Sequence, residues 1–348
     1  MSNGTSNPQE GQKGQKILVF GAGGQIGSDL VPQLHSQGHS VVLVDRVAPE
    51  ATHAYGTFRQ YFSDQPDWKH WWHIIDATDA VAVAHLIREV RPTKVYHLAA
   101  MLSARCEEDP RACWRVNMLS FQNVLDALVA VAGEGYRPRM IWPSSIASFG
   151  CPFDQQPPYD AENEYPLLPR TLYGITKVTG ELLGAYYAEK FRIDFRAVRF
   201  PGLLNTAEPG GGSSDFANAM FFTAARGHGK AVSFVGPEAR IPFMHMADAV
   251  HAIRSLGDAD EASLTRRTYN VAAFPSPSAG EIAESIARHV PGFEVVYEPD
   301  DRAKIVESWP REFDDTPARR DWGWAPKVDS LDALTRRLLD EFAALAKG

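Results

Sequence analysis

Short apolar runs alternate with stretches of helical periodicity through the first 200 residues of the chain. Runs with the length and composition of buried strands lie at residues 16–20, 41–45, 73–77, 94–100, 139–145 and 195–200. Between them, residues 81–90 and 114–131 repeat their apolar positions at the spacing of an amphipathic helix. Such alternation is typical of a parallel sheet with helices on both faces. The pattern therefore predicts an α/β fold built on a doubly wound parallel sheet.

A glycine-rich turn joins the first apolar run to the helix-like stretch that follows it. The segment GAGGQIG places Gly21, Gly24 and Gly27 at GxxGxxG spacing, with Gln25 and Ile26 at the start of the helix. Glycine allows a tight turn and a close approach to a pyrophosphate, and the N-terminus of a helix attracts its negative charge. Asp45 ends the second run, where an acid can bind the adenosine ribose hydroxyls and repel a 2′-phosphate. A purely structural turn is the alternative, but the combination favours a Rossmann dinucleotide-binding corner.

The rhythm of the chain also suggests its domains. Residues 47–72 are rich in His, Trp, Tyr and Phe, and we expect these rings to pack locally instead of binding a ligand. From Pro201 onward, Gly, Pro and Ser gather and the segments become shorter. We predict a flexible tail over residues 1–15, a dinucleotide-binding domain over 16–200 and a smaller substrate-binding portion after it.

Candidate catalytic residues lie in two later segments. Tyr173 and Lys177 are four residues apart, so a helix would place both side chains on one face. A lysine ammonium beside a tyrosine favours the phenolate, so we expect a lowered tyrosine pKa. Ser144 and Ser145 end a predicted strand, at the edge where parallel sheets bind ligands. We expect Ser145 to bond the reacting oxygen of a substrate and Ser144 to be a turn residue.

Composition excludes several classes of function. The 348 residues carry a net charge of −8, which argues against a nucleic-acid partner. Cys106, Cys113 and Cys151 form no CxxC pair and no even set, which favours a reducing, cytoplasmic compartment without structural zinc. No apolar stretch approaches the roughly 18–20 residues that cross a membrane. His245 and His251 are expected to be surface or core residues, and Trp309, Trp322 and Trp324 to be packing anchors.

Together these segments resemble the extended short-chain dehydrogenases/reductases, and more narrowly the L-threonine 3-dehydrogenases of that type. The matching pieces spread over about residues 16–335. They are GAGGQIG, Asp45, IIDATD, HLAAMLSA, RVNMLS, WPSSIASFG, YGITKVTGELL, RFPGLL, PGGGSSDFA and the late SWP and DWGWAP.

The resemblance implies roles for individual residues. Tyr173 would be the acid/base, Lys177 would hold the nicotinamide ribose, Ser145 would orient the substrate hydroxyl, and Asn117 would organise the active-site helix and a water relay. Asp76 would read the adenine amino group. The remaining implied contacts to the cofactor are Ala77, Leu98, Ala99 and Ala100, and those to the substrate are Ser103, Gly212 and Ser214.

The implied reaction is the NAD-dependent oxidation of L-threonine to L-2-amino-3-oxobutanoate, toward glycine or aminoacetone. The implied assembly is a homodimer formed through the helix of Tyr173, where Val178, Leu182, Leu183 and Tyr186 extend an apolar stripe. No metal is implied. The resemblance also implies interleaved domains: the chain would return to the NAD-binding domain near 238–275, and the substrate-binding portion would occupy residues 201–237 and 276–348. The loop reads GSSDFAN where the family usually has GTTDYAV, so a preference for another 3-hydroxy amino acid such as phenylserine stays open. So do a nucleotide-sugar epimerase or dehydratase, a redox-sensing NAD-binding regulator, and use of NADP through Arg46.

Overall fold

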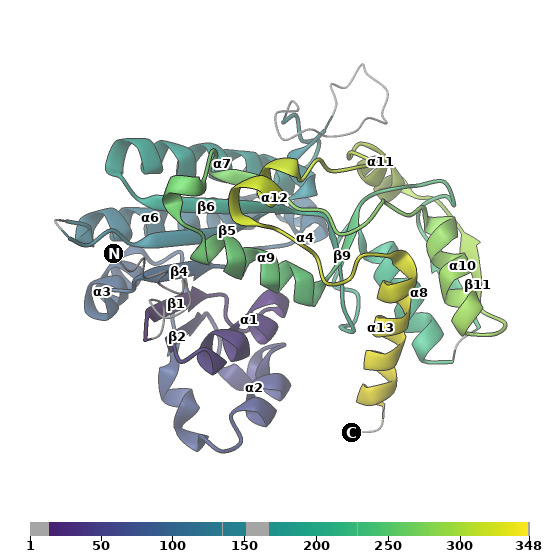
Figure 1. The fold of residues 1–348 in the computed structure, drawn as a ribbon, viewed down its shortest axis with the longest axis horizontal. Helices are drawn as coiled ribbons and strands as arrows, with labels where there is room; N and C mark the ends of the chain where they lie inside the picture. Colours follow the sequence, from purple (N-terminus) through teal and green to yellow (C-terminus); the bar gives the residue numbers. More distant parts are fainter. Residues whose placement is uncertain (1–13, 134, 151–166, 228, 347–348) are drawn as a thin grey trace, which may run out of the picture. The chain divides into compact units, whose positions relative to one another are not determined.

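A seven-stranded parallel sheet confirms the predicted fold class. The computed structural model describes residues 14–133, 135–150, 167–227 and 229–346, so Cys151 and nearly all of the predicted tail lie outside the described residues. The strand order is β3–β2–β1–β4–β5–β6–β10. Figure 1 shows β1, β2 and β4 beside one another. The strands are β1 (Lys16–Phe20), β2 (Ser40–Asp45), β3 (Trp72–Ile74), β4 (Lys94–His97), β5 (Arg139–Ser145), β6 (Asp194–Phe200) and β10 (Thr268–Asn270).

The burial of the strands on both faces explains why the apolar runs in the sequence are continuous. In β1 the four residues after Lys16 are fully buried, and all seven residues of β6 are buried. Helices cover both faces of a doubly wound sheet, so its strands need apolar side chains in both directions. The charged exceptions are satisfied within the protein: Arg139 pairs with Asp194 at 2.6 Å, and Arg196 donates to the carbonyl oxygens of Leu256 and Ala259.

Helices begin and end where the sequence offers caps. Asp79 accepts the first backbone N–H groups of α3, and Ser278 forms a capping box with Glu281 at the start of α10. Gly323 ends α12 with a φ of 70°. The helices are α1 (Gln25–Ser36), α2 (Tyr55–Tyr61), α3 (Ala80–Val90), α4 (Ser103–Glu108), α5 (Pro110–Trp114), α6 (Ser120–Val131), α7 (Leu172–Phe191), α8 (Asp215–Ala225), α9 (Met246–Asp258), α10 (Ala279–His289), α11 (Asp301–Glu307), α12 (Thr316–Trp322) and α13 (Leu331–Leu345).

The chain divides into two compact units. One contains residues 1–99, 119–141 and 187–195, and the other contains residues 100–118, 142–186 and 196–348. The second unit also carries two small parallel strand pairs, β7 (Gly202–Leu204) with β9 (Phe243–His245) and β8 (Lys230–Ser233) with β11 (Glu294–Tyr297). The predicted boundaries of the NAD-binding and substrate-binding portions stay predictions.

The aromatic stretch is a packing cluster, as predicted. Residues 47–72 form α2 and two 3-10 turns, and Phe58, Phe62 and Trp68 are buried there. Phe62 stacks on Trp68 with ring centroids 5.8 Å apart. The late tryptophans also pack as expected, since Trp309 and Trp324 are buried and Trp324 donates to the carbonyl oxygen of Ala272 at 2.9 Å.

Candidate functional site

The glycine turn after β1 is shaped so that only glycine fits at its key positions. Gly21 has a φ of +73°, and a Cβ there would lie 2.6 Å from the backbone nitrogen of Ala99. A Cβ on Gly27 would lie 2.3 Å from the carbonyl oxygen of Ala22. The turn is anchored to the next strand, because Gly21 and Ala22 both donate their N–H groups to the carbonyl oxygen of Val44. This is the close backbone approach that a dinucleotide corner needs.

The rest of this corner carries the expected charge pattern. Gly24 caps α1 without any side-chain hydrogen bond, and the first turn, with Gln25 and Ile26, holds no acidic residue. Asp45 lies at the end of β2, where its carboxylate accepts the N–H of Gly23 at 3.1 Å and of Arg46 at 2.8 Å. A helix start open to an anion beside a strand-end acid fits a dinucleotide with an unphosphorylated ribose.

The strand ends beside this corner hold the other predicted nucleotide contacts. Asp76 is exposed after β3, and its carboxylate accepts the N–H of Thr78 at 2.9 Å. The Ala77 carbonyl oxygen accepts from Asn123 at 3.0 Å, a positioning contact from α6 that the sequence analysis missed. Leu98 and Ala99 follow β4, next to the turn at Gly21, and Ala100 follows them at an exposed position in the other unit. The residues present therefore fit an NAD cofactor.

The second group of candidate residues gathers around the start of α7. Tyr173 and Lys177 lie one turn apart, as predicted, with the lysine Nζ 5.2 Å from the centroid of the tyrosine ring. Lys177 is buried, and its Nζ donates to the carbonyl oxygen of Pro143 at 2.7 Å and lies 4.5 Å from the centroid of the Trp142 ring. Gly174 lets the helix reach this position, because a Cβ there would lie 2.1 Å from the carbonyl oxygen of Ala147.

The expected lowering of the tyrosine pKa is wrong for the protein chain itself. The Tyr173 ring keeps some exposure, but burial of the phenol raises its pKa to about 12, and a hydrogen bond with Ser145 offsets only part of that rise. Burial also lowers the pKa of Lys177 to about 7, while the charge of Glu181 acts in the opposite direction. Both shifts have the same cause, since burial favours the neutral form of each group.

The two serines at the end of β5 face different partners. Ser145 acts to lower the pKa of Tyr173, and its hydroxyl accepts the backbone N–H of Ala147 at 3.1 Å. Ser144 is buried and donates to Glu181, a residue of α7 that the sequence analysis did not single out. Ser144 is therefore more than a turn residue, because it ties the strand end to the helix of Tyr173.

Asn117 joins two segments next to these residues. It lies in a single π-helical turn, a feature that is frequent at functional sites. Its side chain accepts the N–H of Met101 at 2.7 Å and donates to the Met101 carbonyl oxygen and to Thr176 Oγ1, at 3.2 and 3.3 Å. Because Thr176 directly precedes Lys177, Asn117 connects the loop after β4 to the catalytic face of α7.

The cysteines correct the sequence analysis. Cys106 and Cys113 form a disulfide, with Cα atoms 4.8 Å apart. The sequence analysis expected a reducing compartment because the three cysteines form no even set. Both sulfur atoms lie 3.6 Å from the Asn117 amide nitrogen. The argument from cysteine number for a reducing compartment is therefore lost, and the cytoplasmic location stays a prediction.

In the glycine-rich loop before α8, Ser213 contacts Ser103, whereas the sequence analysis singled out the neighbouring Ser214. Ser103 Oγ accepts the N–H of Ser213 and lies 3.2 Å from its hydroxyl, whereas Ser214 begins α8 without a side-chain cap. Asp215 accepts the N–H groups of Gly211 and Gly212 at 2.8 and 2.7 Å. The loop amides that could have bound a substrate carboxylate are thus already engaged by the protein.

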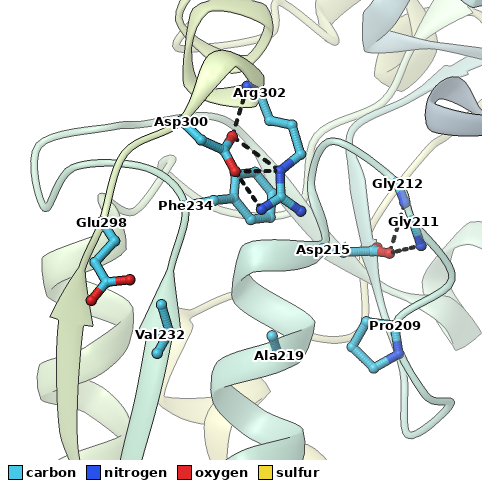
Figure 2. Close-up of a pocket in the computed structure, with 10 residues that line it drawn as sticks. All are labelled: Pro209, Gly211, Gly212, Asp215, Ala219, Val232, Phe234, Glu298, Asp300 and Arg302. Carbon is cyan, nitrogen blue, oxygen red and sulfur yellow. Dashed lines mark hydrogen bonds and ion pairs between the residues drawn. The ribbon is translucent and has the colours of Figure 1, made fainter. Parts of the chain in front are cut away.

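A cavity of about 470 Å³ opens beside this loop. Figure 2 shows Asp215 turned toward Gly211 and Gly212, and Arg302 beside Asp300 over the Phe234 ring. Arg302 is the positively charged residue among those that line the cavity. Its guanidinium donates to both carboxylate oxygens of Asp300. The lining residues are Pro209, Gly211, Gly212, Asp215, Ala219, Val232, Phe234, Glu298, Asp300 and Arg302.

The two histidines that were expected to be surface or core residues differ in burial. His245 is buried, bonds to Glu341 at 3.0 Å and caps α9, whereas His251 is partly exposed and lies 3.3 Å from Ser255 Oγ. Within residues 14–133, 135–150, 167–227 and 229–346, no group of three or more His, Cys, Asp or Glu side chains could hold a metal ion. In the same part of the chain, no helix has the length and apolar character that a membrane crossing requires.

Comparison with known proteins places this geometry in a family. The model of the NAD dependent epimerase/dehydratase family matches residues 17–272. An uncharacterised epimerase/dehydratase of Staphylococcus haemolyticus is 35% identical over 93% of this chain and 96% of its own length.

Two solved structures give the same result in three dimensions. The L-threonine dehydrogenase of Phytophthora infestans is 35% identical, with a TM-score of 0.83 over 95% of this chain and 99% of its own. A monomeric L-threonine 3-dehydrogenase from a metagenome is also 35% identical, with a TM-score of 0.81 over 94% and 99% of the two chains. The chain belongs to the NAD-dependent epimerase/dehydratase family.

Proposed function

We propose that this protein oxidises the 3-hydroxyl of L-threonine to L-2-amino-3-oxobutanoate with NAD. The observation that carries the proposal is the placement of Tyr173 one helical turn from the buried Lys177, whose Nζ lies 5.2 Å from the centroid of the tyrosine ring, because an alcohol oxygen bound at this phenol would meet a base beside a cation. The choice of substrate is supported by the likeness to the L-threonine dehydrogenase of Phytophthora infestans along 95% of the chain.

Each residue then has a defined task. The glycine turn and Asp45 would hold NAD⁺, which would supply the acceptor for the hydride of the hydroxyl-bearing carbon. Ser145 donates a hydrogen bond to the substrate oxygen, and the Tyr173 phenolate takes the hydroxyl proton. When Lys177 is protonated, its ammonium stabilises that phenolate. Asn117 holds the turn that precedes Lys177 in place through Thr176.

Substrate binding is assigned to Ser103 and the loop before α8. The loop is rich in glycine, so it can open and close over a small amino acid and exclude water during the reaction. Ser103 and Ser213 would mark the closed position, since their hydroxyls lie 3.2 Å apart. Gly212 and Ser214 belong to the same loop and are proposed to line the substrate site.

A nucleotide-sugar epimerase or dehydratase is the second candidate, because the family's name includes both activities. The cavity beside the loop argues against it. Asp215, Glu298 and Asp300 line that cavity, and Arg302 is held by Asp300. A nucleoside diphosphate would bring further negative charge to these carboxylates, so it would be repelled unless Arg302 were released.

A substrate panel tests the proposal. Purified protein with NAD⁺ is given L-threonine, phenylserine, a hydroxy acid without an amino group, and UDP-sugars, and NADH is followed by absorbance. We expect NADH with L-threonine, measurable turnover of phenylserine and none with UDP-sugars. NADH from the hydroxy acid but not from threonine would leave only the reductase class. Conversion of a UDP-sugar, followed by chromatography of the products because a redox-neutral epimerase or dehydratase releases no net NADH, would favour the second candidate.

We also propose a homodimer formed through the exposed apolar residues of α7. Leu182 and Tyr186 are 65% and 47% exposed, and Ile175, on the same face, is 43% exposed. Val178 and Leu183, which were predicted to join this stripe, are only partly exposed. A large apolar side chain gains free energy when it leaves water, so three of them on one helical face favour a partner helix.

A further inference from the structure

A third ionisable residue continues the row formed by Tyr173 and Lys177. Glu181 lies one turn beyond Lys177 on α7, so the three side chains fall at positions i, i+4 and i+8 of one helical face. Lys177 and Glu181 are each only 4% exposed. Lys177 and Glu181 are therefore buried on the same face of α7 that carries Tyr173.

The Glu181 carboxylate accepts hydrogen bonds from β6, from the end of β5 and from the 3-10 turn that follows β5. Arg199, in β6, donates to it from Nε at 3.0 Å and from Nη2 at 2.6 Å. Ser148 donates at 3.0 Å, and Ser144 donates from the end of β5. The Glu181 carboxylate is therefore held in place by an ion pair with Arg199 and by hydrogen bonds with two serine hydroxyls.

The charged and titratable groups around Lys177 come from two elements, α7 and β6. On α7 they are Tyr173 and Glu181, and from β6 the guanidinium of Arg199 reaches the Glu181 carboxylate. The Pro143 carbonyl and the Trp142 ring contact the ammonium from β5 without carrying a charge. Burial lowers the Lys177 pKa, and Glu181 is the group that raises it.

We propose that Glu181 is a positioning residue that keeps Lys177 protonated beside Tyr173, so that the tyrosine can act as the base. This inference rests on the proposed function of Tyr173 and Lys177. Once the pair has lost one proton, the other can remain on Lys177, which leaves a phenolate, or on Tyr173, which leaves a neutral amine. The first form is active, and the Glu181 carboxylate, buried one helical turn from the Lys177 ammonium, favours it.

The test replaces the charge and keeps the shape. In Glu181→Gln, the Lys177 pKa should fall, as measured without substrate by NMR of side-chain-labelled lysine, with Lys177→Met used to assign the signal. The rise of kcat/KM with pH should move to lower pH, and its plateau should fall about tenfold for every pKa unit lost. Glu181→Asp, which retains the charge, should recover most of both.

Matched variants separate this effect from a loss of structure. Removing one partner of a buried ion pair is strongly destabilising. If Glu181→Gln does not fold, Glu181→Gln with Arg199→Gln leaves no unpaired charge and should still lower the Lys177 pKa. The control is Asp194→Asn, which breaks a partly buried ion pair elsewhere in the protein, between Asp194 and Arg139. This variant should lower thermal stability and leave the position of the pH profile unchanged.

Two outcomes would overturn the inference. One is an unchanged Lys177 pKa in Glu181→Gln or in the double variant, and the other is a pH profile that shifts as much in Asp194→Asn as in Glu181→Gln. The NMR measurement does not depend on any substrate. Failure of the proposed threonine oxidation would therefore be seen in the substrate panel and would leave the Lys177 titration as a separate result.

Discussion

At the scale of single residues, Tyr173 and Lys177 respond to the same burial in ways that bear on their chemistry. The phenol is neutral when protonated, so burial raises its pKa to about 12. The ammonium is charged when protonated, so burial lowers its pKa to about 7. Neither group is suited to neutral pH alone in the role proposed for it, but together they can lose one proton near neutrality and leave a phenolate beside an ammonium.

Removing the phenolic hydroxyl tests the acid/base role. Tyr173→Phe keeps the ring, and general acid–base catalysis typically contributes about 10²–10⁴-fold, so kcat should fall by that factor. NAD⁺ binding, measured by titration calorimetry, should persist. Tyr61→Phe, at an exposed position, serves as the control and should keep full activity. Normal turnover in Tyr173→Phe would remove this residue from the mechanism.

The pH dependence of oxidation follows from the same pair. The Tyr173–Lys177 pair loses its first proton near the Lys177 pKa of about 7, and the phenolate–ammonium form arises only after that loss, so kcat/KM should rise with pH up to about 7 and then level off. Lys177→Met leaves Tyr173 to ionise alone, and the rise should move far toward the tyrosine pKa of about 12. Steady-state rates across pH check both curves. An identical profile in Lys177→Met would show that the base is another group.

We expect Asp45 to decide whether the protein prefers NAD⁺ or NADP⁺. Its charge should repel a 2′-phosphate, and its oxygens should accept from ribose hydroxyls. Asp45→Asn keeps an acceptor for the Gly23 N–H but removes the charge, and a charged hydrogen bond is worth about 1.5–3 kcal/mol. The ratio of kcat/KM for NAD⁺ and NADP⁺ should therefore narrow by about 10–100-fold. If the native protein prefers NADP⁺, Arg46 dominates instead, and Arg46→Ala should reverse the preference.

The sequence identifies site residues when the signal is local, and misses those that depend on contacts far along the chain. Tyr173, Lys177 and Ser145 could be found because spacing and strand ends place them. Glu181 could not be recognised, because its partners Ser144 and Arg199 come from other elements. The direction of the Tyr173 pKa shift was missed for the same reason, since burial is a property of the folded chain.

At the scale of elements, the loop before α8 gives a sharp comparison. Ser213 contacts Ser103, whereas the neighbouring Ser214 has no side-chain cap bond. Loss of one hydrogen bond costs about 0.5–1.5 kcal/mol, so Ser213→Ala should raise KM for threonine about two- to tenfold and leave NAD⁺ binding unchanged. Ser214→Ala, predicted from the resemblance to raise KM as well, should do so less. The reverse order would mean that the loop closes differently over the substrate.

Element prediction succeeded where apolar runs were long and continuous. All six predicted sheet strands are present, although the run at residues 73–77 is a strand only as far as Ile74. β10 has three residues, too few to form a recognisable pattern, and it joins the sheet beside β6. The π-helical turn at Asn117 was also invisible, because a single shifted turn leaves the helical periodicity nearly unchanged.

At the scale of the whole molecule, the assembly is the open question, and α7 offers the surface to test it. Ile175, Leu182 and Tyr186 are exposed on one face of the helix that also carries Tyr173 and Lys177. If a second copy covers this face, a charge at its centre would have to be buried without a partner, which is strongly unfavourable. Leu182→Glu should therefore convert a dimer to a monomer.

Analytical ultracentrifugation of the native protein and Leu182→Glu measures this directly, and Val81→Glu is the matched control. Val81 is 80% exposed on α3, so a glutamate there adds the same charge at an exposed apolar position outside the proposed interface. We expect a dimer for the native protein and for Val81→Glu, and a monomer for Leu182→Glu. A native monomer would refute the proposed dimer and match the related enzyme described as monomeric. A dimer that survives Leu182→Glu would place the interface on another face, because buried apolar contacts at α7 could not tolerate that charge.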